Sequence, residues 1–456
     1  MLPALFAAKH SAMELRSFSD RNVRWFIVFR VLFNARFYYP VMAILFLDLG
    51  LSLSQYALLN VAWAASIVLL EVPSGALADL VGRKRLVVFA ACLMVCEMAV
   101  FAFTPTGNLT LLFGLFLLNR VISGAAEASA SGADEALVYD SLKADGRESE
   151  WPRVLERLAR WQSAGFFVAM ILGAAVYDPG LVTRAAHFVG SPLTFTKADT
   201  VRWPVDLTLA TSLVTVFAAL RLHENRPELH GTVTARAAFG EVLAAGRWIW
   251  ASPLALFVLA ATVCNDSFIR LFLTIGSQYY RLIHLPEASF GLIGSGFALL
   301  GYVAPPLAKR LIAMEKPARA FGAISAASCI GLSGLAFVIP YVGLLFPLVL
   351  GLAMSVMNFL TSFYLNQAAD SSRRATILSF RGLATNLAYG GTGLLFAGLL
   401  RGLKTTHPTA SPEALFVSAL AWLPWVFIAV AVGLFLRLAR PFPSHSDETS
   451  GVPIAK

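Results

Sequence analysis

Long apolar segments recur along the entire chain, and this recurrence limits the possible folds more than any other feature of the sequence. A run of about 18 or more apolar residues is long enough to cross the hydrocarbon core of a bilayer as a helix. Hydrophobic residues make up 57% of the 456 residues and charged residues only 14%, too few to cover the surface of a soluble protein of this size. The sequence therefore predicts an all-α membrane protein with twelve transmembrane helices.

The basic residues are concentrated in every second loop between the predicted spans. Arg83, Arg373 and Arg374 lie on the basic side, whereas the other side has fewer cations, such as Arg281 and Arg401. Because an excess of Lys and Arg marks cytoplasmic loops, we expect a multi-pass protein of the cytoplasmic (inner) membrane with both termini in the cytoplasm. The predicted spans lie near residues 25–48, 55–77, 86–104, 109–133, 161–177, 204–222, 253–275, 289–311, 319–339, 341–366, 375–400 and 413–437.

The longest polar stretch on the cytoplasmic side divides the spans into two sets of six. It predicts four regions along the chain. A second polar stretch, residues 178–203, lies on the opposite side and is expected to be irregular. The four regions are an N-terminal six-helix bundle over 1–222, a cytoplasmic linker over 223–250, a C-terminal six-helix bundle over 251–440 and a disordered tail over 441–456.

Composition and motifs exclude several classes of function. The net charge of +9 is explained by cations that orient the spans, so we expect no nucleic-acid partner. Cys92 and Cys96 share a helix face without a neighbouring His, which predicts packing rather than a metal site. The chain contains no H-E-x-x-H, G-x-S-x-G or P-loop motif. We therefore expect neither an enzyme nor an ATP-driven pump, and no metal or cofactor.

The segment from Gly75 to Arg85 reads G-A-L-A-D-L-V-G-R-K-R and joins two apolar spans. Its cations mark an aqueous boundary, and its glycines permit a tight turn. The segment resembles the G-x-L-a-D-x-x-G-R-K-R loop between helices two and three of the major facilitator superfamily. An ordinary orienting basic loop is the alternative. The residues assigned to this motif are Gly75, Asp79, Gly82, Arg83, Lys84, Arg85 and Asp134.

This resemblance implies the major facilitator fold, with twelve helices in two six-helix bundles, and a solute transporter. It implies that Asp79 caps helix eleven in the outward-open form. It also implies that Arg83 pairs with an acid at the end of helix four, for which Asp134 and Asp140 are the candidates.

The fourth predicted span carries a polar stripe. Asn119 to Gly124 resembles the R-x-x-x-G segment that the same family has in this helix. Because a charge inside a span is costly, such a stripe should face a partner or a water-filled cavity. We expect Arg120 to bind an anionic group or to modulate a proton-carrying acid, and Glu127 to carry a proton. A buried network that only locks the bundle is the alternative. The stripe comprises Arg120, Ser123, Glu127, Ser131 and Asp134.

Three other spans contribute candidate site residues. In the first span, Arg36 is expected to contact an anionic ligand. In the seventh, Asp266 and Arg270 have the i, i+4 spacing of an ion pair, and Asp266 is a second candidate for the protonated group. Asn358 and Ser362 of the tenth span can orient a ligand or bind neighbouring helices. Glu97 in the third span has no evident partner.

These residues predict a proton-coupled secondary transporter that moves a small organic solute by alternating access. The arginines indicate an anionic or zwitterionic solute and the aromatic residues an amphipathic one, with efflux by antiport favoured over uptake. The fifth span lacks the Gly-Pro step of the family's drug–proton antiporters, which leaves the export direction open. A receptor without transport is a further alternative. The expected partners are the substrate, protons and the lipid bilayer, and we expect a monomer.

Overall fold

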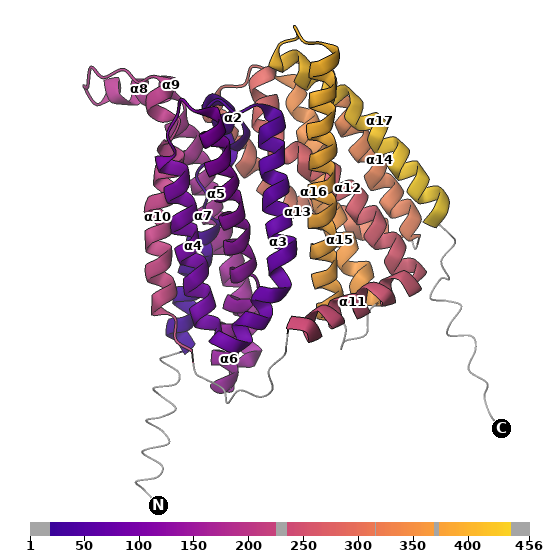
Figure 1. The fold of residues 1–456 in the computed structure, drawn as a ribbon. Helices are drawn as coiled ribbons and strands as arrows, with labels where there is room; N and C mark the ends of the chain where they lie inside the picture. The colour runs from indigo at the N-terminus through magenta and orange to yellow at the C-terminus, as the bar shows by residue number, and fades with distance from the viewer. Residues whose placement is uncertain (1–18, 225–234, 315, 369–373, 439–456) are drawn as a thin grey trace, which may run out of the picture. The chain divides into compact units, whose positions relative to one another are not determined.

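The structure, a computed structural model, describes residues 19–224, 235–314, 316–368 and 374–438, and every regular element among them is a helix (Figure 1). Twelve of the described segments are long and apolar enough to cross a membrane. The elements are a first helix over residues 19–34, η1 (Tyr39–Val41), α2 (Met42–Asp48), α3 (Leu53–Val81), α4 (Arg83–Phe103), α5 (Leu109–Ala130), α6 (Ala133–Ala144), η2 (Glu148–Glu150), α7 (Trp151–Tyr177), α8 (Pro179–Phe188), α9 (Lys197–Thr200), α10 (Trp203–Arg221), α11 (Ala235–Ala251), α12 (Pro253–Leu282), η3 (Glu287–Ser289), α13 (Phe290–Ile312), α14 (Pro317–Leu335), η4 (Val342–Leu344), α15 (Leu345–Ala368), α16 (Arg374–Thr406) and α17 (Pro412–Leu438).

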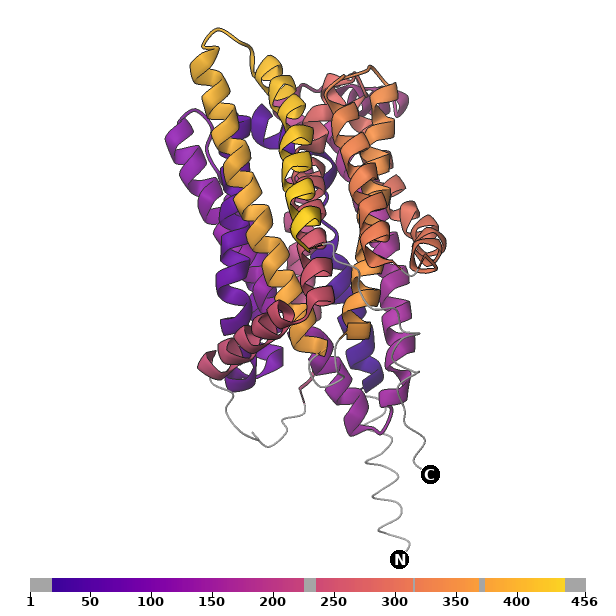
Figure 2. The same ribbon diagram turned by 90° about the vertical axis from the view of Figure 1, so that its right-hand side faces the viewer.

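The described residues form two compact units. Unit 1 lies within Met1–Phe239 and Leu285–Gly296, and unit 2 within Gly240–His284 and Phe297–Lys456. In unit 1, α4 packs against α5 and α10, and α3 packs against α5 (Figure 1). In unit 2, α12 packs against α14, α15, α16 and α17, and Figure 2 shows α16 and α17 in orange and yellow. In unit 1, a cluster of buried apolar side chains includes Phe26, Val87 and Leu137.

Short polar side chains fix where several helices begin. Ser52 and Gln55 form a reciprocal capping box at the start of α3. The Asn108 side chain accepts a hydrogen bond from the Leu111 N–H at the start of α5, and the Ser252 hydroxyl accepts one from Ala255 at the start of α12. These caps satisfy N–H groups that the first turn of a helix leaves without partners.

One region that was expected to be irregular contains helices, and the predicted linker also includes a helix. Residues 178–203 were predicted to be irregular, but they include α8, α9 and the first residue of α10. The predicted linker over 223–250 contains most of α11, and its residues 225–234 lie outside the described part of the chain. Capping explains the first difference, because Asp178 caps α8 and Thr196 and Asp199 form a capping box at α9.

The first membrane span is not one continuous helix. The helix over residues 19–34 ends before Ala35, and the chain resumes as η1 and then α2. A break inside a span leaves backbone groups that lipid cannot satisfy, so protein groups must replace the lost bonds. Here the Phe37 N–H donates to the Thr208 hydroxyl on α10 at 3.1 Å. The break is therefore stabilised by a neighbouring helix of the same unit.

The backbone of α7 approaches this break closely at Gly173. A Cβ atom added to Gly173 would lie 1.7 Å from the Phe37 carbonyl oxygen, far inside van der Waals contact. That neighbour is backbone, so it cannot rotate away as a flexible side chain would. Only glycine therefore fits at this position without a shift of the chain.

We predict that Gly173→Ala lowers the free energy of unfolding by about 1–3 kcal/mol, the usual cost of overpacking. Thermal unfolding of the detergent-purified protein measures the change. Gly114→Ala is the matched control, because a Cβ at Gly114 meets no atom within 4 Å and alanine favours an exposed helix position. Equal stabilities for the two variants would contradict the close approach.

Residues Leu285–Gly296 belong to unit 1, although they follow α12 of unit 2 in sequence. Lys197 of α9 forms an ion pair with Glu287 and donates a hydrogen bond to the Tyr177 carbonyl at 3.0 Å. The Ala288 N–H donates to the Asp178 carboxylate at 3.2 Å. These contacts hold the start of α13 against the end of α7.

We predict that Lys197 and Glu287 are coupled by about 0.5–1 kcal/mol, because both side chains are only partly exposed. A double-mutant cycle with Lys197→Gln and Glu287→Gln, read out by thermal unfolding, measures this coupling. The exposed pair Arg160 and Glu156 serves as the control and should show a smaller coupling. Faster amide exchange over 285–296 in both single variants is also expected, and unchanged exchange would argue against the role of the pair.

Candidate functional site

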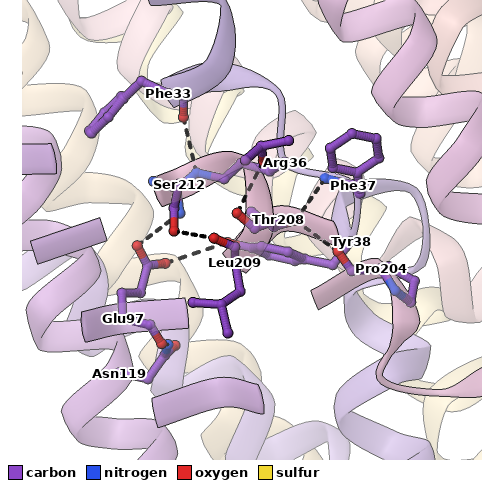
Figure 3. A network of polar contacts seen from close by, with 11 residues as sticks. Phe33, Arg36, Phe37, Tyr38, Glu97, Asn119, Pro204, Thr208, Leu209 and Ser212 are labelled. Atoms are coloured by element: carbon purple, nitrogen blue, oxygen red, sulfur yellow. Dashed lines mark hydrogen bonds and ion pairs between the residues drawn. The ribbon is translucent and has the colours of Figure 1, made fainter. Parts of the chain in front are cut away.

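Arg36 lies at the helix break and forms an ion pair with Glu97 of α4, and both side chains are at most 3% exposed (Figure 3). Arg36 Nη1 donates to Glu97 Oε2 at 2.8 Å, and Arg36 Nε donates to the Phe33 carbonyl at 3.1 Å. The Tyr38 hydroxyl also donates to Glu97, at 3.4 Å. Arg36 was predicted to contact an anionic ligand, but its charge is already balanced inside the protein. A buried pair of this kind is tolerated only when its remaining groups are hydrogen-bonded.

Arg120 of α5 is a second buried guanidinium, and it lacks the partners that Arg36 has. Its side chain is 3% exposed, and its Nε and Nη2 atoms make no hydrogen bond with the described residues. The guanidinium carbon lies 5.3 Å from the centre of the Phe46 ring. The preceding residue, Asn119, donates a hydrogen bond to the Glu97 carbonyl at 2.7 Å, which fixes this turn of α5 against α4. A buried arginine with free donors is suited to bind an anionic group.

The predicted polar stripe does not continue along one helix as far as Asp134. Helix α5 ends at Ala130, Gly132 turns the chain with a φ of +76°, and Asp134 begins the next helix. Ser123 is buried, Glu127 is half-buried and Ser131 is exposed. Arg120, Ser123 and Glu127 thus remain on α5, whereas Asp134 belongs to another network.

Asp134 pairs with Arg30, not with Arg83. Arg30 Nε lies 2.5 Å from Asp134 Oδ2, and its Nη2 donates to Asp134 Oδ1 at 3.0 Å. The predicted partner of Arg83 at the end of helix four is therefore the other candidate, Asp140, which forms an ion pair with Arg83. Nearby, hydrogen bonds to Glu150 and an ion pair with Asp20 raise the pKa of Arg147 above its usual range.

The motif from Gly75 to Arg85 is mostly helical rather than a loop. Helix α3 continues to Val81, and only Gly82, with a φ of +97°, makes the turn. The Arg83 and Lys84 N–H groups at the start of α4 donate to the Glu224 carboxylate at 2.7 and 3.2 Å. Glu224 was not predicted, because it caps a helix far away in sequence. The Asp79 side chain lies outside the described part of the structure, so its predicted capping role stays a prediction.

In unit 2, Asp266 and Arg270 form the ion pair that their spacing predicts. Arg270 Nη2 lies 2.6 Å from Asp266 Oδ2, and Asp266 is 3% exposed. Arg270 Nη1 also donates to Asn386 Oδ1 on α16 at 2.8 Å, and the guanidinium carbon lies 5.4 Å from the centre of the Tyr389 ring. The pair therefore connects α12 to α16.

The tenth-span candidates are engaged by protein groups. The Asn358 side chain is exposed and accepts a hydrogen bond from Arg381 Nη2 at 2.6 Å, while the Ser362 hydroxyl accepts one from Asn366 at 3.2 Å. Arg381 also interacts electrostatically with Asp266. Sequence reasoning missed Arg381 and left Glu97 unexplained. Both are lone charges within an apolar run, and that isolation is the signal that could have identified them.

Comparisons with known proteins agree with this architecture. The chain matches the family model described as Major Facilitator Superfamily over residues 24–393. No curated protein sequence matches it. A crystal structure of the nucleoside transporter NupG (D323A mutant) is similar, with a TM-score of 0.68, 12% identity and coverage of 91% of this chain and 98% of that one.

Two other solved structures are similar to the same extent. A bacterial homolog of the human lysosomal transporter Spinster, in an inward-facing and unoccupied conformation, has a TM-score of 0.66 at 15% identity, covering 92% of this chain and 96% of that one. A D-xylose-proton symporter has a TM-score of 0.62 at 14% identity, covering 93% and 98%.

The family model together with the twelve spans identifies an integral, multi-pass membrane transporter rather than an enzyme. The chain belongs to the Major Facilitator Superfamily.

The two buried arginines of unit 1 should respond oppositely to removal of their charge. We predict that Arg36→Gln lowers the free energy of unfolding by about 3–5 kcal/mol, because it leaves Glu97 buried without its partner. Arg120→Gln should leave stability unchanged or raise it, because it removes a buried charge with free donors. Thermal unfolding without added solute tests both variants, and an equal loss for the two would contradict the difference between their environments.

Proposed function

We propose that this protein is a proton-coupled secondary transporter that moves a small organic anion by alternating access. The observation that carries this proposal is the buried Arg120 guanidinium, whose Nε and Nη2 atoms have no hydrogen-bond partner among the described residues. A carboxylate or phosphate group of the solute would satisfy those donors. The family establishes transport of a small molecule, and the charge of the solute is our inference from this site.

Aromatic rings beside the unit 1 and unit 2 arginines favour a solute with an apolar part next to its anionic group. Phe46 lies beside Arg120, and Tyr389 lies beside Arg270. Rings in these positions provide apolar contact area close to the cation. An amphipathic organic anion suits these surroundings better than a fully polar ion.

The Asp266–Arg270 pair supplies a route for proton coupling. When Asp266 is ionised, it occupies Arg270 Nη2 at 2.6 Å. Protonation of Asp266 removes that negative charge and leaves Arg270 available to an anion, so proton and anion binding favour one another. Glu127, half-buried on α5, remains a second candidate for the protonated group.

This form of coupling favours movement of the anion together with the proton, which is uptake under an inward proton gradient. A solved structure with the same fold is titled a D-xylose-proton symporter. Efflux by antiport, which the sequence favoured, requires instead that protonation weakens anion binding. The sign of the pH effect on anion binding therefore separates the two directions.

The test begins with a panel of small aromatic and aliphatic carboxylates, each paired with its neutral amide. Thermal stabilisation of the purified protein identifies the anions that bind, and flux of the best binder is then followed in proteoliposomes with an imposed pH gradient. We predict that binding strengthens as the pH falls and that flux follows the proton gradient. Stabilisation by the amides as strongly as by the acids would exclude an anion site.

Substitutions of Arg120, Asp266 and Glu127 test the roles proposed for these residues. We predict that Arg120→Gln abolishes anion binding and that Arg120→Lys retains part of it, because lysine keeps the charge but lacks the planar donor fork. Asp266→Asn should still bind the anion but lose gradient-driven accumulation. Arg160→Gln is the control, because this exposed residue lies in a surface pair with Glu156. Full accumulation by both Asp266→Asn and Glu127→Gln would refute the proton sites, and accumulation driven by sodium alone would refute proton coupling.

A further inference from the structure

Helix α8 begins where α7 reaches the edge of the bilayer. Along α7 the last charged residue is Arg160, and residues 161–177 carry no charge. At about 1.5 Å per residue, these 17 residues extend about 25 Å, close to the thickness of the hydrocarbon core. A single residue, Asp178, then separates α7 from α8, and its carboxylate caps α8 by accepting from the Leu181 N–H at 3.0 Å. This position places α8 at the level of the lipid headgroups.

The side chains of α8 divide into an apolar and a polar arc. At about 100° per residue, Leu181, Ala185 and Phe188 share one side, with Val182 beside them. Thr183, Arg184 and His187 share the other side. None of the residues of α8 is fully buried by the protein, although Leu181 and Val182 are partly covered. Phe188 is 92% exposed and the following Val189 is 78% exposed, so the C-terminal end of the apolar arc has no protein cover.

Figure 1 shows α8 projecting sideways from unit 1, across the direction of α7 and α10. The outer surface of α10 is itself apolar, with Leu213, Val214 and Phe217 exposed. In a protein that spans the membrane, such an outward surface contacts lipid. The bilayer is therefore continuous with the position that α8 occupies.

We propose that α8 is an interfacial helix whose binding partner is the phospholipid leaflet at the end of α7. Its apolar arc, with Leu181, Phe188 and Val189, lies toward the acyl chains. Arg184 and His187 lie toward the headgroups, where Arg184 binds lipid phosphate. Burial of a phenylalanine side chain in an apolar medium is favourable, which explains an almost fully exposed phenylalanine at this boundary.

Binding of α8 to the leaflet also positions the contacts at the start of α13. The Phe195 N–H donates to the Thr183 hydroxyl of α8 at 2.9 Å, and the Phe195 ring packs edge-on to Trp203, with the ring centroids 5.4 Å apart. Two residues later, Lys197 pairs with Glu287. The interfacial helix thus fixes the depth of α9 and, through Lys197, of residues 285–296.

Spin labels on the two arcs of α8 test the proposal. Serine replaces the four native cysteines, and Phe188→Cys and His187→Cys are each labelled with a nitroxide. The labelled full-length protein is reconstituted in vesicles of phosphatidylethanolamine and phosphatidylglycerol, and collision rates with oxygen and with a water-soluble nickel chelate are measured. Leu213→Cys provides the lipid-facing reference, and Ala198→Cys, at an exposed position of α9, provides the aqueous one.

We expect the label at position 188 to collide mainly with oxygen, at a depth of about 5–10 Å in the interface, and the label at 187 to collide mainly with the nickel chelate. Equal access of the chelate to both labels would overturn the proposal, because α8 would then lie in water. Shielding of the label at 188 from both reagents would also overturn it, since a protein partner or a second copy of the chain would cover the apolar arc. Size-exclusion chromatography and thermal unfolding confirm that each labelled variant is folded.

Discussion

Burial of ionised side chains away from water is the constraint on which most of this structure depends. Each such group needs an opposite charge, a full set of hydrogen bonds or a ligand, because lipid and apolar side chains offer none of these. Arg36 has Glu97, Arg30 has Asp134, and Arg270 has Asp266. Arg120 departs from this pattern, since two of its donor atoms have no hydrogen-bond partner in the described part of the chain. This contrast between paired and unpaired arginines makes Arg120, rather than Arg36, the candidate for binding an anionic solute.

The break in the first span shows how a polar network and close packing depend on each other. Arg36 lies between the two helical parts of the span, where its guanidinium bonds the Phe33 carbonyl as well as Glu97. Thr208 of α10 satisfies the Phe37 N–H, and Gly173 of α7 lets a second backbone reach the same place. Loss of the Arg36 bond to Phe33 or of the Thr208 bond to Phe37 would leave a polar backbone group without this partner at membrane depth.

The spans and the transporter class could be predicted from the sequence, because the long apolar runs and the Gly75–Arg85 motif are patterns of residues that are neighbours in sequence. The motif's spacing predicted a cytoplasmic turn, but its helical extent to Val81 was missed because glycine at position 75 does not end the helix. The i, i+4 pair of Asp266 and Arg270 was also predictable, since both residues lie on one helix. Most pairings between helices were not predictable. The family resemblance offered Asp140 as one candidate partner of Arg83, but Glu97 and Glu224 could not be matched with Arg36 and with the start of α4. The pairing of Arg36 with another helix was missed for the same reason, and its predicted contact with an anionic ligand stays a prediction.

Helix α13 is shared by both units, because its residues up to Gly296 belong to unit 1 and those from Phe297 onward belong to unit 2. Close approach to the Met170 carbonyl at Gly291 anchors its beginning to α7, and Pro305 and Pro306 lie farther along the same helix. Proline inside a helix removes backbone hydrogen bonds and permits bending. The two prolines of α13 thus lie in its unit 2 part, so a bend there would leave the Gly291 contact with α7 in place.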